Sequence, residues 1–376
     1  MINRVLEENI KNRMGKGKAI VLIGARQTGK TTLMQNILEA YTPHLFFNGD
    51  DPKDRSILED INTEELRSLL GNYKTVFIDE AQRISNIGLT LKIITDQFKD
   101  VQLLVSGSSA FELSNRTNES LAGRKWEYCL YPICWKEFEH FIGYKEALKQ
   151  LHLRLIYGFY PDVINSTGNE AQVLKQLVSS VLYKDILAAG GIRKPDVLEK
   201  LLKALALQLG SEVSYNELAQ LVGVDKNTIS TYIGLLEQSF IIFKLGSFSR
   251  NLRNEIKNNR KIYFYDTGIR NAILGNFAPL ELRQDKGALW ENFLLSERLK
   301  LNHYRGSMAS TYFWRTTEQQ EIDYIEEENG KLSAFEFKWL KKLKSKIPIT
   351  FTKTYQAEVN IIDSENFTEF LSVPRS

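Results

Sequence analysis

The sequence has few cysteines, few histidines and no long apolar run, and each shortage excludes a class of protein. Two cysteines among 376 residues cannot build a disulfide scaffold, and they favour a reducing compartment. The four histidines are scattered and match no metal-binding pattern. No apolar run reaches the roughly 18 residues of a membrane span, and the N-terminal segment MINRVLEENIKNRMGKGK lacks the apolar core of a signal peptide. We therefore expect a cytoplasmic protein that does not enter a membrane.

The charge balance excludes little by itself. The net charge is only +3, so a basic surface for nucleic acid would have to be local. The composition, 43% hydrophobic and 25% charged, is typical of a globular protein. A chain of 376 residues can form two or three domains, each with its own core.

The segment AIVLIGARQTGKTTL combines an apolar strand, a glycine-rich loop and the start of a helix. It matches the P-loop pattern in the strand–loop–helix context that this loop requires, which argues against a chance match in a glycine-rich turn. Backbone N–H groups of the loop can bind phosphates, while Lys30 would contact the β- and γ-phosphates and Thr31 would bind Mg²⁺. The predicted nucleotide-binding residues are Gly24, Ala25, Arg26, Gln27, Thr28, Gly29, Lys30, Thr31 and Thr32.

Two further strands supply the acids and hydroxyls of the predicted ATP site. The segment TVFIDEAQ ends a strand with Asp79, which would hold Mg²⁺, and Glu80, which would polarise the attacking water. The segment VQLLVSGSS places Ser106 and Ser108 at the end of the next strand, and either could sense the γ-phosphate. A simple strand-to-loop turn is the alternative for both serines.

The same region contains two candidate arginine fingers and completes a sheet. Arg116 and Arg124 could project toward the γ-phosphate in cis or toward a neighbouring subunit, and we prefer Arg124 because it follows Gly123 beside a strand. Five predicted strands with intervening helices indicate a three-layer α/β domain. Those strands are residues 19–23, 44–47, 75–78, 101–105 and 127–131.

The middle of the chain predicts a winged helix. The segment SEVSYNELAQLVGVDKNTISTYIGLLEQSFIIFKL gives a helix that Ser214 caps, a short turn and a second helix that begins near Lys226. Lys226, Asn227 and Thr228 would begin a recognition helix. A basic segment that suits phosphate contacts follows, with Arg250, Arg253, Lys257, Arg260 and Lys261. The alternative is a lid or packing module that does not touch nucleic acid.

The segment EIDYIEEENGKLSAFEFKW predicts a hairpin whose acids face each other. Asn329-Gly330 is a strong signal for a two-residue turn, so the numbers of opposed residues sum to 659. Asp323 then faces Glu336, and Glu321 faces Lys338. Ile322, Tyr324, Phe335 and Phe337 would share the other, apolar face. Directly opposed carboxylates repel, so the hairpin needs a compensating charge. Acids that only protect a sheet edge are the alternative.

The motifs together resemble a bacterial and archaeal family of AAA-superfamily ATPases with a C-terminal domain of unknown function. The resemblance rests on GARQTGKTTL, TVFIDEAQRI, VSGSSA, LAGR, YGFYPDV, KIYFYDTGIRNAIL, ALWENFLLSERL and FWRTTEQQEIDYI with FEFKW. It implies ATP binding by residues 24–32, hydrolysis with Asp79 and Glu80, a winged-helix segment and a C-terminal fold similar to restriction endonucleases.

The implied C-terminal site follows the PD-(D/E)xK nuclease pattern. Its positions correspond to Glu291, Asp323, Glu336 and Lys338, with the three acids as metal ligands and Lys338 placed to orient or deprotonate a water. A divalent metal between Asp323 and Glu336 would offset their repulsion and polarise a scissile phosphate. The basic segment that follows, with Lys341, Lys342, Lys344 and Lys346, suits a phosphate-facing surface or a solvated helix face.

We therefore predict an α/β protein in four segments. These are an AAA-type P-loop core of three αβα layers at 1–135, a helical linker or lid at 136–195, a winged helix at 196–265 and a nuclease-like α/β domain at 266–376. We expect ATP and Mg²⁺ as cofactors, DNA or RNA as partner, and a homo-oligomer as one arrangement. The predicted function is a nucleic-acid-associated ATPase with metal-dependent nuclease activity. The alternative is an ATP-driven switch whose inactive nuclease-like domain binds DNA or a protein without cleavage.

Overall fold

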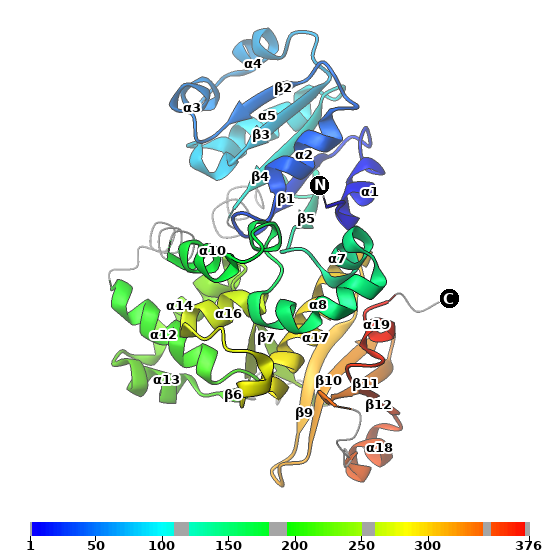
Figure 1. The fold of residues 1–376 in the computed structure, drawn as a ribbon. Helices are drawn as coiled ribbons and strands as arrows, with labels where there is room; N and C mark the ends of the chain where they lie inside the picture. The colour runs from blue at the N-terminus through cyan, green and yellow to red at the C-terminus, as the bar shows by residue number, and fades with distance from the viewer. Residues whose placement is uncertain (1, 109–119, 180–193, 250–259, 341–346, 373–376) are drawn as a thin grey trace. The chain divides into compact units, whose positions relative to one another are not determined.

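The computed structural model describes residues 2–108, 120–179, 194–249, 260–340 and 347–372 (Figure 1). The chain divides into two compact units, Met1–Ile133 with Gln238–Phe240, and Cys134–Glu237 with Ile241–Ser376. In the described part of the chain, no helix combines the length and the apolar character that crossing a membrane demands.

The first unit contains a five-stranded parallel sheet in the order β2-β3-β4-β1-β5. Its strands are β1 (Ala19–Ile23), β2 (Leu45–Asn48), β3 (Thr75–Asp79), β4 (Gln102–Gly107) and β5 (Lys125–Cys129). β1 and β3 are buried along their whole length, which explains their continuous apolar sequences. The five strands lie where the sequence predicts them, within about two residues at each end.

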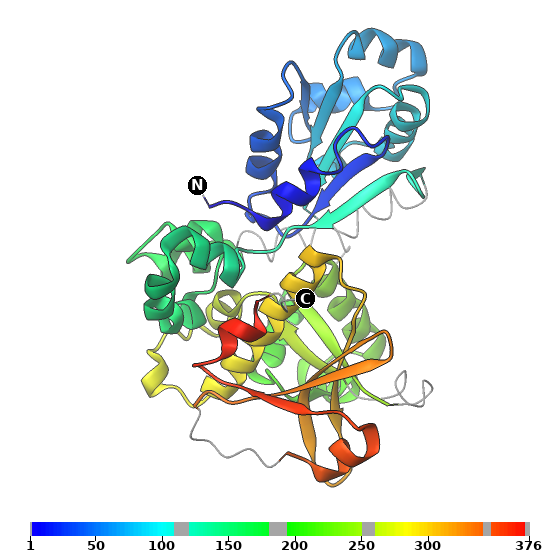
Figure 2. The same ribbon diagram turned by 90° about the vertical axis from the view of Figure 1, so that its right-hand side faces the viewer.

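Helices cover both faces of this sheet, so the predicted three-layer arrangement of the first unit is confirmed. They are α1 (Val5–Lys11), α2 (Lys30–Leu38), α3 (Pro52–Leu58), α4 (Thr63–Leu70), the 3₁₀ turn η1 (Ala81–Arg83) and α5 (Ile87–Gln97). The crossover from β1 to β2 and the one from β3 to β4 run in opposite directions along the sheet. Because such crossovers are right-handed, α2 and α5 lie on opposite faces (Figure 2).

The second unit contains one mixed sheet of seven strands in the order β12-β11-β10-β9-β7-β8-β6. The strands are β6 (Glu212–Val213), β7 (Ile242–Ser247), β8 (Arg260–Phe264), β9 (Ser310–Arg315), β10 (Glu321–Glu328), β11 (Lys331–Phe337) and β12 (Val359–Ile362). The parallel pair β7–β9 joins the strands of the predicted winged helix to those of the predicted C-terminal domain. The two segments therefore share one continuous sheet.

The helices of the second unit include a pair joined by a short turn, α13 and α14, and the long helix α17. They are α7 (Trp135–Ile142), α8 (Tyr144–Tyr157), α9 (Pro161–Ile164), α10 (Glu170–Leu177), α12 (Pro195–Leu207), α13 (Tyr215–Val222), α14 (Lys226–Gln238), α16 (Thr267–Leu274), the 3₁₀ turn η4 (Leu280–Leu282), α17 (Lys286–Arg305), α18 (Ile349–Tyr355) and α19 (Phe367–Phe370). An aromatic core joins α7, α17 and α19. The ring of Trp135 lies 5.1 Å from Phe367 and 6.0 Å from Phe293, and Trp290 lies 5.4 Å from Phe367.

The β10–β11 hairpin has the predicted register. Asn329 (φ 53°) and Gly330 (φ 77°) form the turn, and Tyr324 pairs with Phe335, a sum of 659. Two details of the prediction are wrong. Glu321 does not pair with Lys338, because β11 ends at Phe337; Glu321 contacts Lys261 and Arg315, and Lys338 contacts Glu336. A bulge in β10 between Ile322 and Ile325 moves Ile322 into the core cluster of Ile325, away from Tyr324. The extra residue of a bulge reverses the alternation of faces on one side of it.

Candidate functional site

The P-loop lies at the carboxyl edge of the parallel sheet, where its glycines allow close backbone approach. A Cβ at Gly24 would lie 2.1 Å from the carbonyl oxygen of Leu130, so no larger residue fits there. Gly29 adopts φ 90° directly before α2, a conformation that favours glycine. These constraints fold the loop around the N-terminus of α2, whose N–H groups are suited to bind phosphate.

The side chains of Lys30 and Thr31 both bond within the P-loop region. The buried Nζ of Lys30 donates to the carbonyl oxygens of Gly24 (3.1 Å) and Ala25 (2.9 Å), so the ammonium spans the inside of the loop. The Thr31 hydroxyl donates to Oδ2 of Asp79 at 2.6 Å. A hydroxyl and a carboxylate at this separation are the two protein groups that hold Mg²⁺ in P-loop enzymes, so the residues fit this ion.

Arg4, which no sequence pattern indicates, also contacts the P-loop. Its guanidinium is buried and donates to the carbonyl oxygens of Thr28 (2.7 Å) and Tyr131 (2.6 Å). Both bonds bridge distant parts of the first unit, so Arg4 ties the P-loop to the segment after β5. Arg26, Gln27 and Thr32 are at least partly exposed, as residues that face a nucleotide would be.

Ser106 and Ser108 have different surroundings. Ser106 is fully buried, and its hydroxyl donates to Oδ1 of Asp79. It therefore orients the carboxylate that Thr31 also contacts. Ser108 lies further along the chain and accepts a hydrogen bond from Nε2 of Gln82 at 3.0 Å. Through this glutamine, Ser108 connects to the side chain of Glu80.

Gln82 forms that connection, and the sequence analysis missed it. Its buried amide Nε2 donates to Oε2 of Glu80 (2.6 Å) as well as to Ser108. Glu80 itself adopts φ 48°, which is uncommon outside glycine and marks a constrained turn. Gln82 therefore holds the predicted water-polarising carboxylate and links it to a hydroxyl at the end of β4.

Arg124 does not lie near the ATP site of its own chain. It directly precedes β5, and its carbonyl accepts from Ala19 at the start of β1, so it lies at the opposite end of the parallel strands from Gly24. Its Nε contacts Oδ1 of Asp96 at 2.5 Å. The prediction that Arg124 acts as an arginine finger on the ATP site of its own chain is therefore wrong, because the full length of β1 lies between Arg124 and the P-loop. An arginine finger toward a neighbouring subunit stays a prediction. Arg116 lies outside the described residues.

In the second unit, the predicted metal ligand Glu291 contacts a buried lysine. The ammonium of Lys261, whose side chain is 2% exposed, contacts Oε1 of Glu291 at 3.1 Å and Oε1 of Glu321. The hydroxyl of Tyr263 donates to the same oxygen of Glu291 at 2.5 Å. The prediction that Lys261 serves phosphate contacts is wrong, because β8 turns its side chain into the core. Burial disfavours the ammonium, but Glu291, Glu321 and Asp323 more than offset this and raise the pKa of Lys261.

The acids of the hairpin lie next to this lysine. Asp323 lies near enough to Glu336 for their charges to interact, and the N–H of Phe337 donates to Oδ2 of Asp323 at 2.7 Å. Burial, followed by the charges of Glu291 and Glu336, raises the pKa of Asp323 well above its ordinary value. Lys338 donates to Oε1 of Glu336 at 2.6 Å.

The three predicted ligands do not form a metal site. Within the described ranges, no group of three or more His, Cys, Asp or Glu side chains is arranged to hold a metal. Oε1 of Glu291 already accepts from two donors, and Oδ2 of Asp323 accepts from the backbone. The buried Oε2 of Glu336 has no hydrogen-bond partner, which leaves one oxygen of the cluster open to a further donor. The basic residues predicted at 250, 253, 257, 341, 342, 344 and 346 lie outside the described residues.

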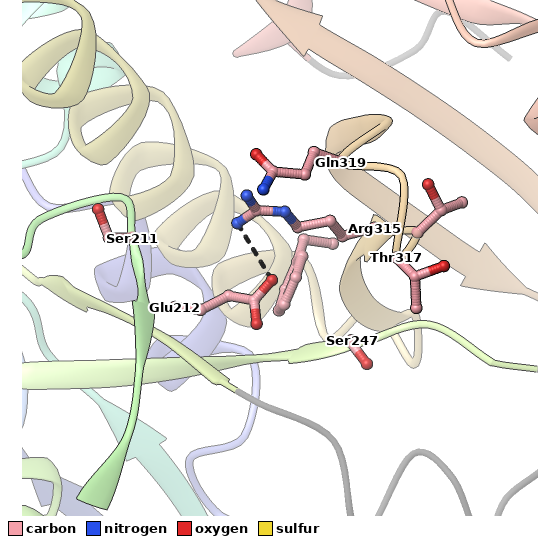
Figure 3. Close-up of a pocket in the computed structure, with 8 residues that line it drawn as sticks. Ser211, Glu212, Ser247, Arg315, Thr317 and Gln319 are labelled. Carbon is pink, nitrogen blue, oxygen red and sulfur yellow. Dashed lines mark hydrogen bonds and ion pairs between the residues drawn. The ribbon is translucent and has the colours of Figure 1, made fainter. Parts of the chain in front are cut away.

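A polar pocket of about 570 Å³ adjoins the cluster (Figure 3). Hydroxyls of Ser211, Ser247 and Thr317 line it, and the guanidinium of Arg315 points toward Glu212, with the atoms 3.2 Å apart. Nε of Arg315 also lies 3.7 Å from Oε2 of Glu321, so the pocket wall connects to the carboxylates around Lys261.

Comparison with known protein families agrees with the fold of the first unit. Residues 16–139 match the family described as AAA domain. Residues 148–280 and 286–367 match two families described as Domain of unknown function (DUF8612) and Domain of unknown function (DUF4143). The first match, with the parallel sheet and the P-loop geometry, defines an AAA-type P-loop ATPase domain and supports ATP binding and hydrolysis.

Sequence similarity to other proteins extends over most of the chain. An uncharacterized protein of Mycobacterium tuberculosis is 28% identical over 335 residues, which are 88% of this chain and 72% of the relative. An uncharacterized protein of Methanocaldococcus jannaschii is 24% identical over 345 residues, 86% of this chain and 75% of the relative. Among solved structures, the Walker-type ATPase of Pyrococcus abyssi matches with a TM-score of 0.53 and 15% identity, over 73% of this chain and 96% of that one. This last likeness concerns the fold alone.

Proposed function

We propose that the protein is a Mg²⁺-dependent ATPase that associates with nucleic acid and uses its C-terminal segment for binding without cleavage. The observation that carries the ATPase part is the convergence of Lys30, Thr31, Asp79 and Glu80 at one edge of the parallel sheet. Thr31 and Asp79 already lie within hydrogen-bond distance of each other, at 2.6 Å. Ligands gather at that edge in sheets of this kind.

Each residue has a distinct task in this proposal. Lys30 exchanges its bonds to the loop carbonyls for bonds to the β- and γ-phosphates, and the N-terminus of α2 binds the phosphate oxygens. Thr31 and Asp79 hold Mg²⁺, which when bound neutralises charge on the phosphates. Glu80 accepts the proton of the attacking water, while Gln82 fixes its carboxylate.

ATP hydrolysis and nucleotide binding test this assignment separately. Lys30→Ala should abolish binding of a fluorescent ATP analogue, because it removes the main phosphate ligand. Glu80→Gln should keep binding and lose at least about 100-fold in hydrolysis rate, because the amide cannot accept the proton. Glu39→Gln, an exposed glutamate just after α2, is the control for loss of a charge. Full hydrolysis by Glu80→Gln would remove Glu80 from the proposal.

The helix-turn-helix carries the nucleic-acid part of the proposal. Asp225 caps α14 by accepting from the N–H groups of Asn227 (2.8 Å) and Thr228 (3.0 Å). Behind this cap Ile229 and Ile233 are buried, while Lys226 and Asn227 are exposed at the start of the helix. This is the part of a helix-turn-helix that contacts base edges and phosphates.

The salt dependence of DNA binding by the full chain tests this part. Lys226→Ala should weaken binding of a fluorescent duplex and lower the slope of log Kd against log salt by about 1, because one phosphate contact is lost. Lys200→Ala, an equally exposed lysine on α12, should leave both unchanged. Wild-type protein that binds neither duplex nor single strands at low salt would favour the alternative in which this module is a lid.

The carboxylate cluster favours binding over cleavage in the C-terminal segment, because a lysine and a backbone N–H already use oxygens of Glu291 and Asp323, two of the three predicted metal ligands. Incubation of DNA with wild type, Asp323→Ala and Glu80→Gln in Mg²⁺ or Mn²⁺ separates the two functions. Cleavage that Asp323→Ala abolishes would restore the metal-dependent nuclease. The ATPase assignment stands on other residues and is unaffected by either result.

A further inference from the structure

The cluster around Lys261 contains more carboxylates than an apolar sheet–helix interface normally accepts. Glu291 comes from α17, Glu321 and Asp323 from β10, and Glu336 from β11. Glu291 and Glu321 contact Lys261 of the inner strand β8, which pairs with β6 and β7 on its two sides, and Asp323 lies beside them with Glu336 as its neighbour. Buried carboxylates require a counter-charge to stay ionised. The fold must therefore supply a cation here.

Lys261 is placed to be that cation. It is an inner-strand residue, paired with Glu212 and Leu245, so its backbone position is fixed from both sides. Its ammonium contacts carboxylates from two other elements and lies 5.3 Å from the ring centroid of Phe313, within range of a cation–π interaction. A single ammonium thus connects β8, β9, β10 and α17.

A divalent ion would compete with this lysine for the same oxygens. Lys261 and Tyr263 both donate to Oε1 of Glu291, and Mg²⁺ or Mn²⁺ needs free oxygen lone pairs at about 2.1 Å. A second cation beside the ammonium would also be repelled by it.

We propose that the Lys261 ammonium is the resident cation of this carboxylate cluster and takes the place of a divalent metal. The domain holds its acids together without a metal, and the cluster gains metal affinity only when the ammonium is removed. This inference rests on the second unit alone and is independent of ATP hydrolysis by the first.

Counting bound Mn²⁺ by electron paramagnetic resonance tests the inference on the full chain. All variants carry Asp79→Asn, so that the P-loop contributes no metal site. The Asp79→Asn chain should bind no Mn²⁺ at millimolar concentration, and Lys261→Met should bind about one ion per chain. Adding Asp323→Asn should abolish this gain. Lys261→Arg, which keeps the charge, and Lys338→Met, which removes the neighbouring lysine, should bind none.

Thermal unfolding provides a second readout that does not need a fully stable variant. Mn²⁺ should raise the midpoint of Lys261→Met by roughly 5 °C at a concentration well above its Kd, and should leave the Asp79→Asn parent unchanged. Mn²⁺ bound by the parent and lost with Asp323→Asn would overturn the inference, as would a folded Lys261→Met chain that gains no ion. If Lys261→Met does not fold even with Mn²⁺ while Lys261→Arg does, the cluster depends on the ammonium, and a parent that binds no Mn²⁺ then supports the inference.

Discussion

The two acid pairs of the molecule, Asp79 with Glu80 and Asp323 with Glu336, look alike in the sequence but differ in what holds them. In the first unit, the bonds to Asp79 come from the hydroxyls of Thr31 and Ser106. In the second, the N–H of Phe337 donates to Asp323 and the ammonium of Lys338 contacts Glu336, while the ammonium of Lys261 contacts the neighbouring Glu291. A hydroxyl can turn its proton away and become a metal ligand itself, whereas an ammonium keeps its charge and excludes the metal. The partner of an acid therefore decides whether a metal can use it.

Removing the Lys261 charge tests the claim with the largest expected effect, that this ammonium is the counter-charge of the acids in the second unit. Lys261→Met in metal-free buffer should lower the free energy of unfolding by about 3–5 kcal/mol, because it leaves buried carboxylates without their counter-charge. The measurement is urea denaturation followed by circular dichroism. Lys338→Met is the matched control, since its side chain is 26% exposed and its ammonium contacts Glu336, and it should cost about 1 kcal/mol or less. Equal losses in both variants would mean that burial does not distinguish the two lysines.

Counting bound Mn²⁺ ions in the presence of nucleotide tests the second claim, that the acids of the first unit can bind a metal. With a non-hydrolysable ATP analogue, wild type and Asp323→Asn should each bind one Mn²⁺ per chain, and Asp79→Asn should bind none. Hydrolysis by Asp79→Asn should fall by about 100-fold or more, because the ion that neutralises the phosphates loses a ligand. A second ion in the wild type that disappears in Asp323→Asn would make the two acid pairs equivalent and break the comparison.

The first site could be predicted because its signals are local. Gly24 to Thr31 form one continuous loop, and Asp79 follows an apolar strand whose carboxyl end must share an edge with the P-loop in any parallel sheet. Gln82 lies only two residues after Glu80, but no spacing rule connects a glutamine in a 3₁₀ turn to the carboxylate before it. Its role depends on the positive φ of Glu80, which the sequence does not reveal.

The second site could be predicted only in part, because its decisive contact is long-range. The turn at Asn329-Gly330 set the register, and so the approach of Asp323 to Glu336 followed from the sequence. Lys261 lies far from both along the chain, at the end of a basic run that resembles a phosphate-binding loop. Only the pairing of β8 between β6 and β7 turns its side chain inward. Likewise, a one-residue bulge that no pattern announces moved Ile322 to the other face.

Substituting Gln82 should have a smaller effect than removing Asp79, and it tests whether a neutral donor orients the acid of the first site. Gln82→Ala should lower kcat by about 10–100-fold with little change in nucleotide affinity, because Glu80 loses the donor that orients it while the P-loop is untouched. Steady-state hydrolysis and equilibrium binding separate the two quantities. Gln82→Asn keeps the amide on a shorter side chain and should recover part of the rate. A change in affinity without a change in kcat would indicate that Gln82 only supports the fold of the loop.

The smallest expected effect concerns Asp285, an acid of the second unit that cations hold at the protein surface. Burial opposes its ionisation, but bonds from Arg283 (2.8 Å) and Arg270 (2.5 Å) outweigh it and lower its pKa to about 2. A depressed folded-state pKa means that its stabilisation is complete above the unfolded value of about 3.9 and disappears as the pH falls toward 2.

Asp285→Asn should therefore cost about 1–2 kcal/mol at pH 7, allowing for the 28% exposure of the side chain, and progressively less below pH 4. The difference in unfolding free energy between wild type and variant, measured from pH 7 to pH 2.5, gives this profile. A difference that grows as the pH falls would show that the arginines do not hold the carboxylate ionised. The pKa of Asp285 would then no longer contrast with that of Asp323, which burial and two neighbouring acids raise despite a nearby lysine.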